Sequence, residues 1–114
     1  MRLFDTHMIV ELLRTRKHEL GAISIITLIE VLRGIKTEKR TEVKKLLEKS
    51  FNVLNINNTV VETYCGLYET LKKEGKLIPD ADILIAATSI AYGLKLKTKD
   101  QHFKRLKTQG LKLE

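Results

Sequence analysis

Short apolar runs alternate with amphipathic stretches along the whole chain, and this alternation restricts the fold more than any other feature. Each apolar run has the length and composition of a strand, and the stretch after it carries apolar residues at helical spacing. Strands that alternate with helices in this way form βα units, which pair as a parallel sheet with helices on both faces. We therefore expect an α/β fold, a three-layer αβα sandwich around a mostly parallel sheet of four or five strands.

The expected elements follow one another without a linker, a repeat or a low-complexity segment. Strands are expected at Arg2–Phe4, Ala22–Ile25, Phe51–Ile56, Leu94–Lys97 and Leu111–Leu113. Helices are expected from Asp5 to beyond Leu13 and at Thr27–Ile35, Glu38–Ser50, Thr59–Lys73, Ala81–Tyr92 and Gln101–Leu106. The chain has 114 residues, of which 43% are hydrophobic, so we expect one domain, residues 1–114, with a single core.

Charge and cysteine content restrict the possible partners and the cellular location. The formal net charge of +7 fits a polyanionic partner, such as nucleic acid or an acidic protein segment, as well as it fits a plain lysine-rich surface. The single cysteine, Cys65, excludes an internal disulfide and a cysteine-based zinc site. No span approaches the roughly 20 apolar residues of a membrane helix. Asp5, His7 and Glu11 interrupt any apolar core of a signal peptide, so the expected location is the cytoplasm.

All four aspartates of the chain stand at the ends of predicted elements. Asp5 ends the first strand and Asp100 follows the fourth. In an open parallel sheet, ligands bind beyond the carboxyl ends of the strands, near the point where the strand order reverses. Asp80 and Asp82 begin a nearly uncharged helix after Pro79. We expect Asp80 to cap this helix and Asp82 to present a free carboxylate, because a helix N-terminus stabilises negative charge.

Glu30 differs from most of the other glutamates, which lie among lysines on amphipathic helices. It is the only acid between Glu19 and Glu38. With Thr27 and Arg33 it forms a narrow polar stripe at a spacing of three residues, on a helix that is otherwise apolar. Such a stripe fits a solvent-exposed face and the lining of a cleft equally well.

Acids that meet in one cleft require a cation among them. Four carboxylates within about 5 Å would repel one another by roughly 3 kcal/mol per pair at an effective dielectric constant near 20. Oxygen ligands without cysteine suit a hard ion such as magnesium or manganese. Such an ion lowers the pKa of bound water and neutralises charge that develops on a phosphate. Acids in a basic protein therefore indicate phosphodiester hydrolysis.

Four segments, in order along essentially the whole chain, resemble the motifs of the PIN-domain family. They are Phe4–Ile9, in which a strand ends in aspartate-threonine; Ser24–Gly34, in which a glutamate follows a serine and a threonine; Asp82–Thr88; and Thr98–Phe103. Each motif alone is a weak signal, but the four together are specific. The closest resemblance is to the VapC-type toxins of prokaryotic toxin–antitoxin pairs.

That resemblance implies an endoribonuclease that requires magnesium or manganese. The acids that it implies for catalysis and metal binding are Asp5, Glu30, Asp82 and Asp100. Thr6 and Thr98 are implied as neighbours of these acids, with Thr98 hydrogen-bonding near the cluster. The resemblance also implies a homodimer, an RNA substrate that is frequently a transfer or ribosomal RNA, and a cognate antitoxin whose tail enters the acidic cleft.

Two residue-level differences and two other functions remain open. His7 stands where the family often has asparagine or serine, and it fits both a polar residue at the cleft mouth and a catalytic base. The segment Arg14–Ala22 is shorter than the family pattern. A PIN-type nuclease with housekeeping RNA or DNA substrates and no antitoxin would share the same site. A catalytically silent domain that binds RNA or protein is the third function. A small antitoxin reading frame just upstream in the genome would favour the toxin.

Overall fold

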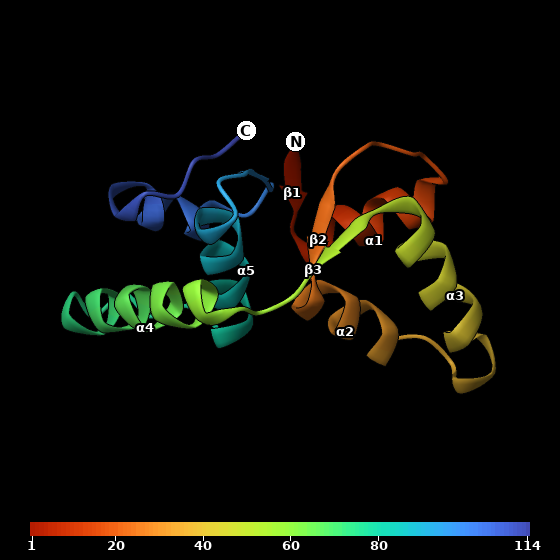
Figure 1. Ribbon diagram of the computed structural model, residues 1–114, viewed down its shortest axis with the longest axis horizontal. Coiled ribbons are helices and arrows are strands. Elements are labelled where there is room, and N and C mark those ends of the chain that lie inside the picture. Colours follow the sequence, from red (N-terminus) through yellow and green to blue (C-terminus); the bar gives the residue numbers. More distant parts are fainter.

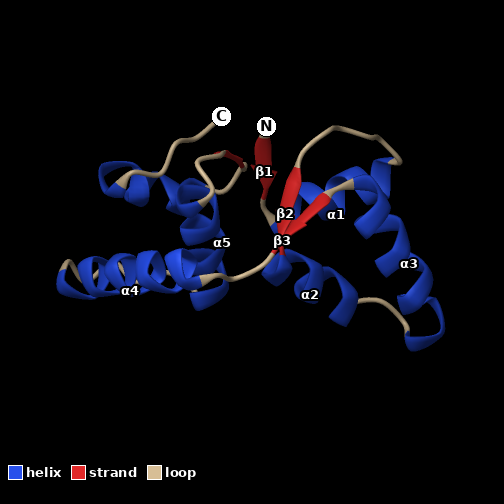
Figure 2. Cartoon of the chain, in the orientation of Figure 1, coloured by secondary structure: helices blue, strands red, loops and turns tan.

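The computed structural model describes residues 1–114 and contains one parallel sheet with helices on both faces (Figures 1 and 2). The sheet has the order β3-β2-β1-β4. Its strands are β1 (Arg2–Phe4), β2 (Ala22–Ser24), β3 (Asn52–Leu54) and β4 (Lys95–Lys97), and every neighbouring pair is parallel. The expected α/β class and parallel sheet are confirmed.

The predicted fifth strand, Leu111–Leu113, is wrong. Only Leu113 pairs with the sheet, through a single parallel bridge to Leu96. The preceding segment turns at Gly110, which has a φ of 101°. This turn places the buried Leu111 in the core, where its N–H donates to the carbonyl of Leu106 at 3.2 Å. Too little chain therefore remains in register for a strand.

The helices form two groups, one on each face of the sheet (Figure 1). One group contains α1 (Thr6–Thr15), α2 (Ile25–Arg33) and α3 (Thr37–Ser50). The other contains α4 (Asn58–Lys73), α5 (Asp80–Ala91) and a 3-10 segment, η1 (Gln101–Gln109). None of these helices combines the length and the apolar character that crossing a membrane requires.

The sheet divides the apolar interior into two clusters rather than the single core that we expected. Successive strand residues face opposite sides of a sheet. Leu3 and Ala22 accordingly pack with α4, α5 and η1, whereas Phe4 and Ile23 pack with α1, α2 and α3. All four side chains are fully buried. Alternating apolar residues in short strands thus hold both helical layers on one sheet.

The strand order places the functional edge of the sheet. From β1 the chain moves through β2 to β3 on one side and then returns to β4 on the other side of β1. The order therefore reverses between β1 and β4, and ligands of such sheets bind beyond the carboxyl ends of the strands at this point. Asp5 follows β1 directly, and Thr98 and Asp100 follow β4.

Candidate active site

Asp5 is fixed in one orientation by two hydrogen bonds. It is the N-cap of α1, and its Oδ1 accepts from the backbone N–H of Met8 at 2.9 Å. Its Oδ2 accepts from the hydroxyl of Thr98. The side chain is buried, and an aspartate that accepts two hydrogen bonds keeps its carboxylate in a defined position.

Thr98 links the ends of β1 and β4. Its hydroxyl donates to Asp5 and accepts from the backbone N–H of Asp100 at 3.0 Å. Asp100 in turn is the N-cap of η1, and its Oδ1 accepts from the backbone N–H of His102 at 3.3 Å. Capping thus positions both Asp5 and Asp100 at the carboxyl edge of the sheet.

Glu30 lies on α2 with its carboxylate held by Thr6. Its Oε1 accepts from the Thr6 hydroxyl at 2.6 Å, and its Oε2 lies 3.6 Å from Nη2 of Arg33. The polar stripe that we identified in the sequence runs from the interior to solvent. Thr27 is fully buried, the Glu30 side chain is 20% exposed, and the Arg33 side chain is 73% exposed. Glu30 therefore occupies the boundary between core and solvent.

The prediction that Asp80 caps α5 is wrong. Pro79 occupies the cap position with a ψ of 142°, and its carbonyl accepts the first helical hydrogen bonds, from Asp82 and Ile83. Asp80 is already helical, and its Oδ1 instead accepts from the hydroxyl of Tyr64 at 2.6 Å. This hydrogen bond to Asp80 is the main reason that the pKa of Tyr64 rises to about 12.

Asp82 approaches His102, a residue that the sequence did not single out. Oδ2 of Asp82 lies 2.9 Å from Nε2 of His102, and Nδ1 of the same ring lies 3.0 Å from Oδ1 of Asp100. Burial raises the pKa of Asp82, and the charges of Glu30 and Asp100 raise it further, whereas His102 opposes the shift. The only sequence signal for His102 was its position two residues after a capping aspartate, within the fourth motif.

A pocket of about 210 Å³ brings the four predicted acids together. It is lined by Asp5, Glu30, Asp82 and Asp100, with Thr6, His7, Pro79 and Ala81. The acids come from the end of β1, from α2, from the first turn of α5 and from the start of η1. Both groups of helices therefore contribute to one cleft. Asp80 does not line it, and the exposed His7 does.

The residues of this cleft fit a divalent cation. The raised pKa of Asp82 has the direction that crowded, partly buried carboxylates produce. Donor atoms of Asp82, Asp100 and His102 lie within 4.8 Å of one another. Nε2 of His102 is buried and has no hydrogen-bond partner. Carboxylate oxygens with one imidazole nitrogen form a donor set that metal ions bind, and such a site next to a phosphate supports phosphodiester chemistry.

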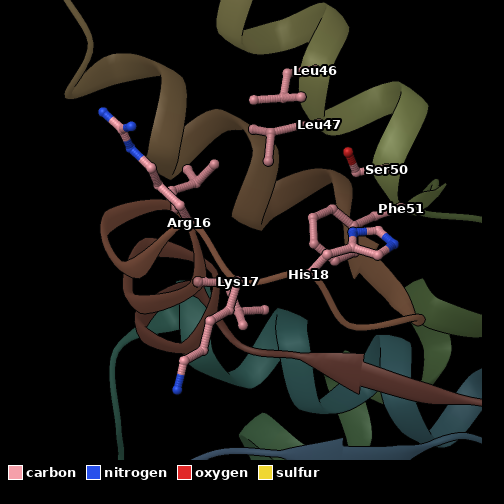
Figure 3. Close-up of a pocket in the computed structure, with 9 residues that line it drawn as sticks. Arg16, Lys17, His18, Leu46, Leu47, Ser50 and Phe51 are labelled. Atoms are coloured by element: carbon pink, nitrogen blue, oxygen red, sulfur yellow. The ribbon is translucent and has the colours of Figure 1, made fainter.

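A second pocket of about 240 Å³ lies between α1 and α3 and shares no residue with the acidic cleft. Its apolar lining is Leu12, Leu13, Leu46, Leu47 and Phe51. Figure 3 shows the ring of His18 beside that of Phe51, with their centroids 6.3 Å apart. Arg16 and Lys17 complete a basic rim. No acid lines this pocket, so it lacks the chemistry of the cleft.

The comparisons with known proteins agree with the four motifs. The model of the PIN domain matches residues 2–109. The chain is 40% identical to Ribonuclease VapC1 of Methanocaldococcus jannaschii over 115 aligned positions, covering 97% of this chain and 85% of the relative.

Solved structures give the same result. The chain matches the structure of VapBC-1 from nontypeable Haemophilus influenzae with a TM-score of 0.86 and 25% identity, over 99% of this chain and 96% of that one. It matches FitAcB from Neisseria gonorrhoeae with a TM-score of 0.76 and 26% identity, over 100% and 97% of the two chains. The resemblance seen in the sequence is confirmed, and the chain belongs to the PIN-domain family.

Proposed function

We propose that this chain is a metal-dependent endoribonuclease and the toxin of a VapBC-type toxin–antitoxin pair. The observation that carries the proposal is the cleft in which four separate elements each present one acid. A relative that is 40% identical over nearly the whole chain is a ribonuclease VapC1. The net charge of +7 favours a polyanion such as RNA, for which transfer and ribosomal RNA are the proposed classes.

Asp5, Glu30, Asp82 and Asp100 are the residues that we propose to hold Mg²⁺ or Mn²⁺. A divalent ion there supplies positive charge against the phosphate and activates water for attack. The protein contributes the positioning of the ligands. Thr98 and the first turn of α1 fix Asp5, and the Thr6 hydroxyl orients Glu30 toward the cleft. Side chains fixed in this way lose little freedom when a ligand binds.

A cognate antitoxin is the proposed protein partner. The solved neighbours include a toxin–antitoxin complex from Klebsiella pneumoniae, which is 26% identical and has a TM-score of 0.72 over 90% of both chains. A cluster of carboxylates attracts a cationic side chain as well as a metal ion. We therefore propose that an antitoxin tail enters the cleft. We also propose that residues 1–114 form one domain, that this domain assembles as a homodimer, and that it acts in the cytoplasm.

The test is cleavage of RNA by the purified full chain with and without divalent ions. We expect activity with added Mg²⁺ or Mn²⁺ and none after chelation, because the cleft needs a cation to approach a phosphate. Restored activity after the ion is returned is the control for damage by the chelator. Robust cleavage by metal-free protein would contradict metal dependence, and no cleavage in any condition would favour a silent binding domain.

Coexpression with the neighbouring reading frame separates the toxin from a processing nuclease. We expect a small upstream protein to copurify with the chain and to inhibit its cleavage of RNA. A nuclease that is active but has no such partner would be a PIN-type nuclease of RNA processing.

A further inference from the structure

We propose that His102 is a metal ligand of the acidic cleft and that its nitrogen makes the site prefer Mn²⁺ over Mg²⁺. The inference deepens the proposed function, because it assumes that the cleft binds a divalent ion. It goes further by adding a nitrogen donor to a site that was expected to contain only oxygen donors.

The His102 ring is placed between two of the acids. Its Nε2 lies 2.9 Å from Oδ2 of Asp82, and its Nδ1 lies 3.0 Å from Oδ1 of Asp100. The ring packs against Phe103 with the centroids 4.9 Å apart, and Phe103 is almost completely buried. The His102 side chain itself is 24% exposed, so it borders the cleft rather than the core. Packing and the two carboxylates therefore keep the ring at this edge.

The environment of Nε2 is that of a ligand atom without its ion. The atom is buried and has no hydrogen-bond partner, although an Asp82 oxygen is only 2.9 Å away. Buried polar atoms in native proteins are nearly always paired, so an unpaired one needs an explanation. A cation that contacts both Nε2 and Oδ2 satisfies both atoms.

The other ring nitrogen has the surroundings that a metal-binding imidazole requires. Such rings usually have a carboxylate or carbonyl partner for the second nitrogen, which fixes the orientation of the ring. Oδ1 of Asp100 lies within ion-pair distance of Nδ1. Asp100 still has its Oδ2 for the ion. One carboxylate can thus support the imidazole and contribute to the same site.

A nitrogen donor changes which ion the site prefers. Mg²⁺ is bound almost entirely by oxygen atoms and water, whereas imidazole suits transition-metal ions. A donor set of carboxylates with His102 therefore favours Mn²⁺ over Mg²⁺ more than four carboxylates alone would. The chain contains two other histidines as internal controls. His7 lines the cleft from α1, and His18 lies in the distant pocket between α1 and α3 (Figure 3).

The experiment is Mn²⁺ binding to the full chain without RNA, followed by pulsed electron paramagnetic resonance. We expect a nitrogen coupling from a coordinated imidazole in the wild type, its loss in His102→Asn, and its retention in His7→Asn and His18→Asn. Loss of a supporting residue usually weakens metal binding by about 10- to 100-fold. The ratio of Mn²⁺ to Mg²⁺ affinity should therefore fall by at least about tenfold in His102→Asn.

A second variant keeps the inference testable if His102→Asn does not fold. His102→Asp replaces the imidazole with a carboxylate, so it should still bind ions but lose both the nitrogen coupling and the preference for Mn²⁺. A wild type without nitrogen coupling, or a coupling that survives in both His102 variants or disappears in His7→Asn alone, overturns the proposal. Nuclease activity is a separate result. Nitrogen coupling without RNA cleavage keeps the ligand and rejects the nuclease, and cleavage without coupling does the opposite.

Discussion

At the scale of single residues, Asp82 shows how the cleft opposes the charge that its function requires. Burial is the main cause of its raised pKa, and the charges of Glu30 and Asp100 add to the shift. An acid whose pKa is higher in the folded state than in the unfolded state destabilises the fold once it is ionised. This penalty is absent below the ordinary aspartate pKa of about 3.9 and develops as the pH rises through the folded-state pKa.

Asp82→Asn should therefore stabilise the metal-free protein at pH 7 while abolishing RNA cleavage. The gain in melting temperature should shrink as the pH is lowered toward the ordinary aspartate pKa, because the wild-type carboxylate then becomes neutral as well. Thermal melting of both proteins over this pH range is the measurement. A variant that melts well below the wild type at pH 7 would show that the Asp82 carboxylate is structural.

A hydrogen-bonded chain at the same scale leads to a prediction for Thr27. A hydroxyl has one hydrogen and an ionised carboxylate has none. The Thr6 hydroxyl donates its hydrogen to Glu30, so the 3.1 Å contact between Thr6 and Thr27 requires Thr27 to be the donor. Thr27 is fully buried and does not line the cleft. It is therefore a positioning residue that acts on Glu30 through Thr6.

Thr27→Val keeps the shape of the side chain but removes the donor. We expect kcat to fall by about tenfold, the lower end for the loss of a supporting hydrogen bond, with KM nearly unchanged. Thr27→Ser should restore most of the activity because it restores the hydroxyl. Steady-state cleavage of a defined RNA, with a melting curve for each variant, is the measurement. An inactive Thr27→Ser, or a fully active Thr27→Val, would argue against this role.

At the scale of elements, the first turn of α5 separates two aspartates that the sequence could not assign correctly. The sequence predicted the helix to within one residue, because Pro79 ends the preceding segment and Gly93 follows the helix. The role of Asp80 depends on Tyr64, which is sixteen residues away and belongs to α4. Local spacing contains no information on such a tertiary contact.

Asp80→Asn should leave RNA cleavage nearly unchanged, whereas Asp82→Asn should remove it. Loss of the Asp80 charge should also lower the pKa of Tyr64 from about 12 toward the ordinary value. Spectrophotometric titration of tyrosine in wild type and variant measures this shift, with Tyr68 and Tyr92 as a shared background. A well-folded Asp80→Asn that cleaves no RNA would mean that both aspartates serve the site.

Local patterns gave the strands and helices of the site but not its side-chain contacts. The aspartates after β1 and β4 were visible because a parallel sheet brings the carboxyl ends of its strands together. The position of Glu30 remained open, because a polar stripe on a helix has the same spacing whether it faces solvent or a cleft. His102 was missed, since its contacts with Asp82 and Asp100 arise only when η1 and α5 meet beside the sheet.

At the scale of the whole molecule, the cleft lies where the two helical layers meet. Asp5 and Glu30 belong to the side of the sheet covered by α1 and α2, and Asp82 and Asp100 to the side covered by α5 and η1. A cation bound among them joins the two layers. The unfolded chain cannot present these ligands together, so the ion stabilises the native state by mass action.

Mg²⁺ or Mn²⁺ should therefore raise the melting temperature of the wild type. At an ion concentration 100 times the Kd, the stabilisation is about 2.7 kcal/mol, which for a domain of this size is a shift on the order of 10 °C. Asp82→Asn and Asp100→Asn should respond little to either ion.

Asp5 differs from these two acids because Thr98 donates to it and it caps α1, so Asp5→Asn should also lower the melting temperature of the metal-free protein. The measurement is thermal melting of all four proteins with chelator and with each ion. If Asp82→Asn and Asp100→Asn melt well below the wild type in every condition, these acids stabilise the fold directly and do not form an ion-binding site.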